Sequence, residues 1–438
     1  MSRSEKPPHI ITDIVLEIFG HLRHSPRALR QCSLVCKQWV YPSQELVFRT
    51  IRVLNNTLTR DFQHLIRFLT DHQILSSFVK HLVLLKEKGE VGKRCLDLQQ
   101  LHEIISRLPK LTSLQLCDLD LRACAEGIQK AFQVPHNVPR GPIPQIRTLL
   151  LDRISVAPVD FTYFLRLVSS VETLHITDSE STMRKPPCHS PLPVNLANLR
   201  CIKLNCSPLG SGLIQRLSET HPSSRFHSLS IVEHDPITPD VFRNPTFSSS
   251  STLRRLCLYL KNVASDRDRN QMNALRCLDL ASFHSLTELK VTMKLAWTDY
   301  ELHDSSLDIQ WTLLLGLVES CTATRIIISL TPPQYGPRSM GPRYTRQLSQ
   351  CLLNDWWTIL QELEWRILDD CLASKAIVPE VGFMGEISGT HDLVNTSSRE
   401  NLGNVLEENI RSRMPRMSSL GRIRFWNGDR GSENWWFS

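Results

Sequence analysis

The sequence predicts an α/β protein in which a short all-helical N-terminal module is followed by a long array of repeated units, with parallel strands inside and helices outside. Two observations favour this fold class. Residues 10–53 have helical apolar spacing, and the rest of the chain repeats the pattern apolar-x-x-apolar-x-apolar, with helically spaced segments between the copies. Strand, helix and strand at such a period predict a right-handed coil of stacked units.

The N-terminal segment has the spacing of three short helices followed by a strand. Ile14, Ile18 and Leu22 recur at i, i+4 and i+8, and Val15 and Phe19 widen this apolar face. About 45 residues is near the lower limit for an isolated core, so the segment is expected to lean on a partner or on the next part of the chain.

Local signals place the second and third helices. Ser25-Pro26 supplies a helix start, with a hydroxyl able to cap and a proline at the first helical position, and Leu29 lies inside that helix. An apolar cluster around Trp39 comes next, and Pro42 is expected to break its pattern before the strand.

A composite motif runs through these helices. It comprises DIVLEIF, the Arg-Ala-Leu-Arg-x-Cys run at 27–32, Ser-Leu-Val-Cys-Lys at 33–37, Trp39, and Leu-x-Phe-Arg-x-Ile at 46–51. This combination resembles an F-box, in the version common at the N-termini of fungal F-box proteins. One feature departs from the family pattern, because Ile10-Ile11 stand where Leu-Pro usually precedes the first helix.

The resemblance implies a function. The chain would be the substrate-recognition subunit of an SCF-type cullin ubiquitin ligase, docking on the Skp-type adaptor through residues 10–47 and presenting a target protein on residues 48–438. It would itself be no enzyme and need no cofactor or metal. The adaptor-binding residues that fit the motif are Ile14, Val15, Ile18, Phe19, Leu22, Leu29, Leu34, Val35 and Trp39. Some of them must form internal core, and the spacing does not separate the two sets.

The repeated pattern supports the rest of the fold. Its middle position advances by 25 to 35 residues from Leu114 through Leu149, Leu174, Ile202, Leu229 and Leu256 to Leu289, near the period of a leucine-rich repeat. Further copies begin at Val79, Leu360 and Leu420, with a weaker one at Ile326 and Ile328, and residues 48–53 share the spacing. Helices are expected at 101–108, 161–168 and 213–217.

The match to the full leucine-rich pattern is partial. Leu119, Ile154, Ser207 and Lys261 stand where Asn or Cys would bond the turn backbone, so the turns must be satisfied in another way. The prediction is therefore an irregular, leucine-rich-repeat-like solenoid. Loop insertions are expected near 134–144, 183–195 and 331–344, where Pro and Gly gather. Residues 372–400 hold either a further insertion or a hidden repeat, and residues 1–9 are expected to be disordered.

Composition limits the partners. The net charge is +7 over 438 residues, but residues 1–53 contain no run of consecutive basic residues that would bind a phosphate backbone, so no nucleic acid is expected. Thirteen scattered cysteines, an odd number, are typical of reduced thiols that serve as small hydrophobes, as at Cys201, Cys257 and Cys277. Neither a signal peptide nor a membrane-spanning apolar run is found, which favours the cytoplasm or nucleus and no membrane partner.

Single motifs admit other interpretations. His21, His24, Cys32 and Cys36 could form a zinc site, but packing in the apolar stripe explains the cysteines better. Trp426, Trp435, Trp436 and Phe437 favour a cap on the last repeat over a recognition surface. Arg338, Arg343 and Arg346 suit solvated loops better than an acidic or phosphorylated partner.

Alternative functions remain open at the level of sequence. The first is a non-ligase repeat scaffold whose N-terminal helices only cap the solenoid. The second is a hydrolase or transferase built on the solenoid, although the nucleotide, esterase and metalloprotease motifs are missing.

Overall fold

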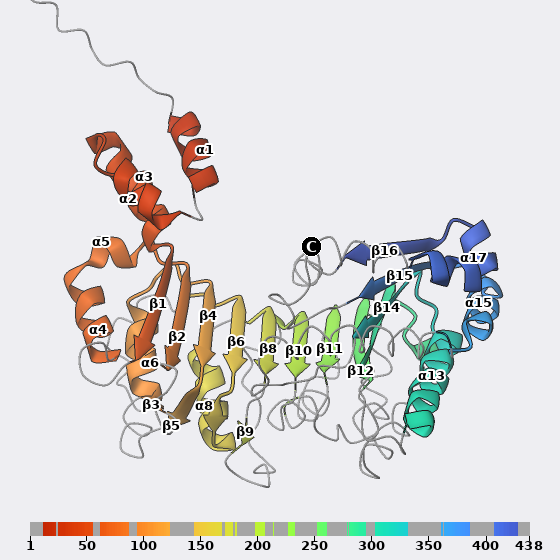
Figure 1. The fold of residues 1–438 in the computed structure, drawn as a ribbon. Coiled ribbons are helices and arrows are strands. Elements are labelled where there is room, and N and C mark those ends of the chain that lie inside the picture. Colours follow the sequence, from red (N-terminus) through yellow and green to blue (C-terminus); the bar gives the residue numbers. More distant parts are fainter. Residues whose placement is uncertain are drawn as a thin grey trace, which may run out of the picture. The chain divides into compact units, whose positions relative to one another are not determined.

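The computed structural model describes residues 12–22, 25–55, 62–86, 94–122, 144–168, 171–177, 180–181, 198–205, 213, 227–232, 252–260, 278, 280–294, 303–331, 361, 363–385 and 407–427. The chain divides into two compact units, unit 1 (Met1–Leu199) and unit 2 (Arg200–Ser438). Each unit is α/β, with parallel strands flanked by helices (Figure 1).

Unit 1 begins with a helical module. Its helices are α1 (Thr12–Leu22), α2 (Pro26–Cys32) and α3 (Lys37–Phe48). Helix α2 starts at Pro26, as predicted, but the Ser25 side chain makes no capping hydrogen bond. The expected break at Pro42 is wrong, because α3 runs through it. The lost backbone hydrogen bond is offset by tertiary packing, since Trp39, Leu46 and Val47 of α3 all pack on the module core.

The main sheet of unit 1 is parallel, and its strands are hydrogen-bonded in chain order. They are β1 (Thr50–Asn55), β2 (His81–Lys86), β4 (Ser113–Cys117), β6 (Thr148–Asp152) and β8 (Thr173–Thr177). A second, short parallel sheet contains β3 (Arg94–Asp97), β5 (Leu119–Arg122), β7 (Ser155–Val156) and β9 (Glu180–Ser181).

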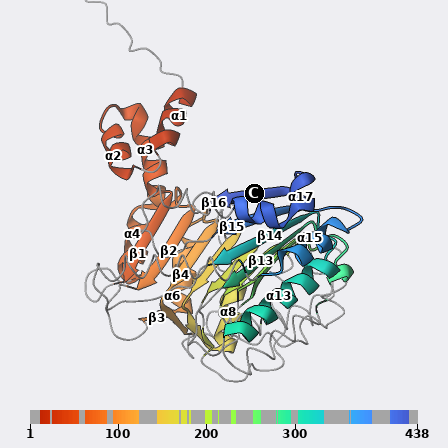
Figure 2. The same ribbon diagram turned by 45° about the vertical axis from the view of Figure 1, so that its right-hand side comes forward.

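Helices cover one face of the main sheet in unit 1 (Figure 2). They are α4 (Phe62–Asp71), α5 (Gln73–Ser76), α6 (Leu98–Ser106) and α8 (Pro158–Leu167). The strands alternate, so that Leu82 and Leu84 of β2 are buried while their neighbours are half-buried. This alternation places the core between sheet and helices.

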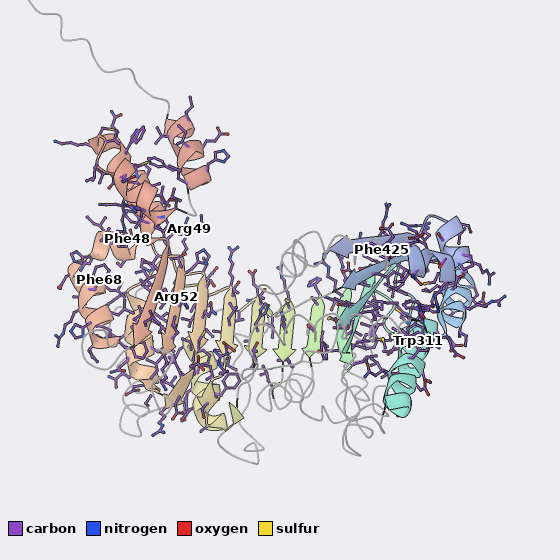
Figure 3. All side chains as sticks on the ribbon, viewed as in Figure 1. Phe48, Arg49, Arg52, Phe68, Trp311 and Phe425 are labelled. Carbon is purple, nitrogen blue, oxygen red and sulfur yellow. The ribbon has the colours of Figure 1, made fainter. Side chains whose placement is uncertain are left out.

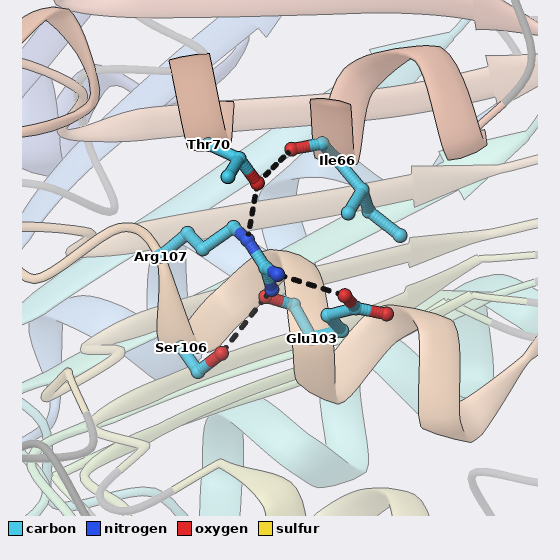
Figure 4. Close-up of polar contacts among 5 residues, drawn as sticks. All are labelled: Ile66, Thr70, Glu103, Ser106 and Arg107. Atoms are coloured by element: carbon cyan, nitrogen blue, oxygen red, sulfur yellow. Dashed lines mark hydrogen bonds and ion pairs between the residues drawn. The ribbon is translucent and has the colours of Figure 1, made fainter. Parts of the chain in front are cut away.

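Side chains fix the start of α6 and its contact with α4. Asp97 caps α6 by accepting from the Gln99 N–H at 2.9 Å. Arg107, just after α6, donates from Nε to Thr70 Oγ1 on α4 at 3.0 Å and from Nη2 to Glu103 Oε1 at 2.8 Å (Figure 4). Thr70 Oγ1 in turn donates to the Ile66 carbonyl at 2.8 Å. The two helices are thereby joined at their exposed edges.

The turns after β4 and β6 show how the turn backbone is hydrogen-bonded without the Asn or Cys side chain of the leucine-rich pattern. Asp118 and Arg153 take positive φ values of 56° and 50°, and their N–H groups donate to the Asp152 and Thr177 carbonyls of the following strands at 2.9 and 2.8 Å. The Arg153 guanidinium also donates to both Asp118 carboxylate oxygens, at 2.6 and 2.8 Å. The bonds to the strand carbonyls satisfy the backbone N–H groups of these turns, and the charged bidentate bond links the two consecutive turns.

Unit 2 repeats the same plan. Its strands, again parallel and in chain order, are β10 (Cys201–Asn205), β11 (Ser228–Val232), β12 (Arg255–Leu260), β13 (Glu288–Lys294), β14 (Arg325–Thr331), β15 (Glu380–Gly385) and β16 (Ile423–Asn427). Its helices include the 3-10 turn η2 (Leu280–Ser282), α13 (His303–Ser320), α15 (Trp365–Ala373) and α17 (Pro415–Ser419), and residues 407–413 are also helical.

Aromatic rings run through the core of unit 2. Trp311 of α13 meets Trp365 of α15 with ring centroids 5.2 Å apart, and Trp365 meets Phe383 of β15 at 5.8 Å. Phe383 stacks on Phe425 of β16 at 5.7 Å, and the Arg411 guanidinium lies 5.3 Å from the Phe425 ring centre. Edge-to-face and stacked pairs of this kind add to the stabilisation from burial.

A buried carboxylate joins α15 to α17. Asp369 is 1% exposed, and its two oxygens accept from the backbone N–H groups of Arg416 and Met417 at 2.9 and 2.8 Å. These are unpaired donors of the first turn of α17, so α15 supplies the cap that the α17 sequence lacks. The adjacent Asp370 is exposed and only pairs with the Arg416 side chain at 2.8 Å.

The predicted strand positions are confirmed at β2, β4, β6, β8, β10, β11, β12, β13, β14 and β16, and the helices predicted at 101–108 and 161–168 correspond to α6 and α8.

The copy predicted from Leu360 to Trp365 is wrong, because Trp365 begins α15. Strand β15 instead lies within 372–400, so that segment contributes a further strand to the parallel sheet. The predicted loops at 134–144, 183–195 and 331–344, the helix at 213–217 and residues 1–9 lie largely outside the described residues.

We expect Asp369→Ala to lower the free energy of unfolding of the α15–α17 region by about 2 to 4 kcal/mol, because two charge-assisted hydrogen bonds to buried amides are lost. Hydrogen exchange of the amides in 365–373 and 415–419 measures this. The matched variant Asp370→Ala removes an exposed pair and should cost less than about 1 kcal/mol. Equal effects of the two variants would contradict the capping role.

Candidate functional site

The helical module of unit 1 has its own small core. Val15, Phe19 and Leu29 are buried there, and Leu22, Cys32, Trp39, Leu46 and Val47 pack around them. Phe19 is fully buried, and its ring meets Trp39 edge-to-face at 5.4 Å. Among the predicted adaptor-binding residues, Val15, Phe19, Leu22, Leu29 and Trp39 are therefore placed in or against this core.

The other four predicted residues lie on the surface. Ile14 and Ile18 are one turn apart on α1 and are 48% and 44% exposed, although their neighbours Val15 and Phe19 are buried. Leu34 and Val35, in the turn between α2 and α3, are 85% and 64% exposed. The α1 stripe thus divides into an inner and an outer part.

The exposed turn is held in place by α2. The Leu34 N–H donates to the Gln31 carbonyl at 3.0 Å, and the Val35 N–H donates to the Cys32 carbonyl at 3.1 Å. The Ser33 hydroxyl donates to the Arg30 carbonyl at 2.6 Å. These bonds satisfy the last carbonyls of α2, so the turn presents Leu34 and Val35 from a fixed backbone.

Exposed side chains of this size favour contact with another protein. Fully burying one Leu, Ile or Val yields about 1.5 to 3 kcal/mol, and adjacent exposed apolar residues mark interaction sites more often than scattered ones do. We name the four residues Ile14, Ile18, Leu34 and Val35 the apolar docking residues. They can bind an apolar surface but offer no group for bond chemistry.

Two exposed apolar residues near the module have no counterpart among the predicted residues. Tyr41 of α3 is 56% exposed, and its ring meets the buried Phe78 edge-to-face at 4.8 Å. Ile74 of α5 is 71% exposed. Neither belongs to an apolar repeat in the sequence, and no sequence signal marks them.

The proposed zinc ligands do not form a described site. His24 lies outside the described residues, and within the described chain no group of three or more His, Cys, Asp or Glu side chains could hold a metal ion. Burial raises the pKa of the Cys117, Cys201 and Cys321 thiols, which keeps them protonated and weakly nucleophilic. Cys201 and Cys257 are buried, as small hydrophobes would be, and Cys277 is not described.

Other candidate residues cannot be placed. Seven of them lie outside the described part of the chain: the side chains of Trp426, Trp435, Trp436 and Phe437, and residues Arg338, Arg343 and Arg346.

No helix among the described residues is both long and apolar enough to cross a bilayer. No protein-family model matches the sequence, and no curated protein matches it either.

We expect Phe19→Ala to lower the local stability of the module by about 3 to 5 kcal/mol, because a fully buried ring is lost and Trp39 loses its partner. Leu34→Ala should change stability by less than about 0.5 kcal/mol, because Leu34 contributes little to the core. Hydrogen exchange of peptides from α1, α2 and α3 distinguishes the two variants. A comparable loss of protection in both would show that Leu34 is part of the core.

Proposed function

We propose that this chain is the target-recognition subunit of an SCF-type cullin ubiquitin ligase. In this function the helical module is an F-box that docks on the Skp-type adaptor, and the strand–helix units form a leucine-rich-repeat-like array that holds the target. The observation that carries the proposal is the pair of exposed apolar groups, Ile14 with Ile18 and Leu34 with Val35, at positions of the F-box-like motif.

The division between core and surface supports this interpretation. The module already has an inner core, so the apolar docking residues are not needed to close it. Because these side chains are 44% to 85% exposed, their burial by a partner would yield about 4 to 7 kcal/mol before the costs of association, which is a substantial contribution to a complex. An adaptor with an apolar groove is the partner that the motif implies.

The mechanism involves no bond chemistry in this chain. The module would bind the ligase through the adaptor, while the array would bind a target, so that a ubiquitin-charged enzyme meets the target lysines at a high local concentration. Parallel strands in chain order with helices on one face, in each unit, are compatible with such an array.

We expect co-expression with a Skp-type adaptor to yield a stoichiometric complex, and Leu34→Asp with Val35→Asp to weaken it by at least about 100-fold. Titration calorimetry on the purified partners measures the change. These two residues are better targets than Trp39, because Trp39 packs on the buried Phe19 and its loss would also destabilise the module.

Ile74→Asp is the matched control. It adds one carboxylate, where the double variant adds two, at an exposed apolar residue of unit 1 outside the apolar docking residues, and it should leave adaptor affinity unchanged. A wild-type chain that stays monomeric beside the adaptor would rule out the ligase function.

A second candidate is a repeat scaffold whose N-terminal helices only cap the array. It is favoured by the direct passage of α3 into β1, which are separated by Arg49 alone. A cap does not require exposed apolar residues on its outer side, and this is why we place it second. The adaptor titration separates the two functions.

A further inference from the structure

The junction between α3 and β1 gathers basic residues. Arg49 is the one residue between the two elements, and Arg52 lies on β1 (Figure 3). The N–H groups of Lys80 and His81 both donate to the Arg49 carbonyl, at 2.9 and 3.0 Å. The starts of β1 and β2 therefore bring Arg49, Lys80 and His81 together, and Arg52 follows three residues after Arg49.

The charge at this junction is only partly compensated. Glu45 of α3 lies 3.7 Å from the Lys80 ammonium, and both side chains are more than a third exposed. Arg49 and Arg52 are exposed, and neither has an acidic partner in the part of the chain that the structure describes. Among the described residues, three cations thus face one carboxylate.

The side chain of His81 is affected by the positive charges of Arg49 and Lys80. Burial, followed by the charges of Arg49 and Lys80, lowers the pKa of His81. Burial disfavours any charge at this position, but the contributions of Arg49 and Lys80 show that both cations lie close enough to act on the His81 side chain. The backbone hydrogen bonds and the causes of the His81 pKa shift therefore both place Arg49 and Lys80 near His81.

Apolar side chains lie beside these cations on one face of the sheet. Arg52, Leu54, His81, Val83 and Leu85 alternate with inward-facing residues of β1 and β2, and Arg52 is in register with Val83 as Leu54 is with Leu85. Leu54 is exposed, and Val83 and Leu85 are half-buried. On β1, Leu54 follows Arg52 by two residues, or about 7 Å, and on β2, Val83 and Leu85 follow His81 on the same face.

The corresponding face of unit 2 is different. Ser230, Lys290 and Ser329, which occupy that face on β11, β13 and β14, are all buried. These three positions are therefore closed to a partner, although Arg325 at the start of β14 is exposed on the same face. In unit 1, Arg52 and Leu54 are both exposed.

We propose that Arg49, Arg52 and Lys80, together with Leu54, Val83 and Leu85, form a surface that binds an extended protein segment carrying carboxylates beside apolar side chains. We call these six residues the cationic junction. The role of the cationic junction in holding a target rests on the proposed function. Its ability to bind a peptide does not depend on that function.

The chemistry favours an acidic peptide over nucleic acid. Along the strand starts of unit 1 the row reads Arg49, Lys80, Thr112, Arg147 and Glu172, which interrupts the basic stripe that a phosphate backbone would follow. Arg147 is moreover 3.9 Å from Glu172. Apolar side chains add nothing to phosphate binding but bury well against Leu, Ile or Val of a peptide.

The experiment selects peptides from a random display library on the full-length chain, without adaptor, and measures the affinity of a selected peptide by fluorescence anisotropy. We expect selected sequences to combine Asp or Glu with apolar residues. Replacing their acids by amides, or Arg49 and Arg52 by Glu in the protein, should each weaken binding at least about tenfold. Arg67→Glu with Lys110→Glu, an equal charge change at two exposed residues outside the cationic junction, should leave affinity unchanged.

Each outcome of this experiment either supports the proposed peptide-binding surface or overturns it. No enrichment, selected peptides without acids, unaltered affinity in Arg49→Glu with Arg52→Glu, or displacement of the peptide by single-stranded RNA would each overturn the proposal. Unchanged thermal unfolding of the variants excludes misfolding as the cause of a loss. The Leu34→Asp with Val35→Asp chain should still bind peptide, so failure of this proposal and failure of the ligase function are told apart.

Discussion

Parallel pairing in a fixed register is the constraint on which each unit depends. Each strand places its alternate residues, such as Leu82 and Leu84 or Leu114 and Leu116, opposite the same positions of its neighbour, so apolar side chains form continuous rows beneath the helices. A slip by one residue would turn these rows to the other face. The steps between strands vary widely in length, because the constraint acts on the strands and leaves the connections free.

The same constraint explains which parts of the fold could be predicted from sequence. Rows of Leu and Ile repeat in the chain because they repeat in space, and the strands they mark are present. The pattern failed at Leu363 and Trp365, where the spacing also suits a helix, and tertiary contacts of Trp365 with Trp311 and Phe383 stabilise α15. It failed at β15 because Gly382 and Gly385 weaken the strand signal of EVGFMG.

The candidate site could be predicted only in part. The motif identifies a broad apolar stripe on α1, but Ile14 and Val15 are equally apolar, and only the packing of α2 and α3 decides that Val15 faces inward. The exposure of Leu34 and Val35 depends on hydrogen bonds to the last carbonyls of α2, which spacing does not encode. The cationic junction could not be predicted from the sequence, because Arg49 and Lys80 come together only when β1 pairs with β2.

The passage from α3 to β1 through one residue has a mechanical consequence. Arg49 contributes only two soft dihedral angles, and contacts on both sides, Glu45 with Lys80 and Tyr41 with Phe78, restrain them further. Torque applied at the helices is therefore transmitted directly to the first strands. The orientation between a partner on α1 and a peptide on β1 and β2 would be set by backbone stereochemistry, whereas a flexible tether would only set an average separation.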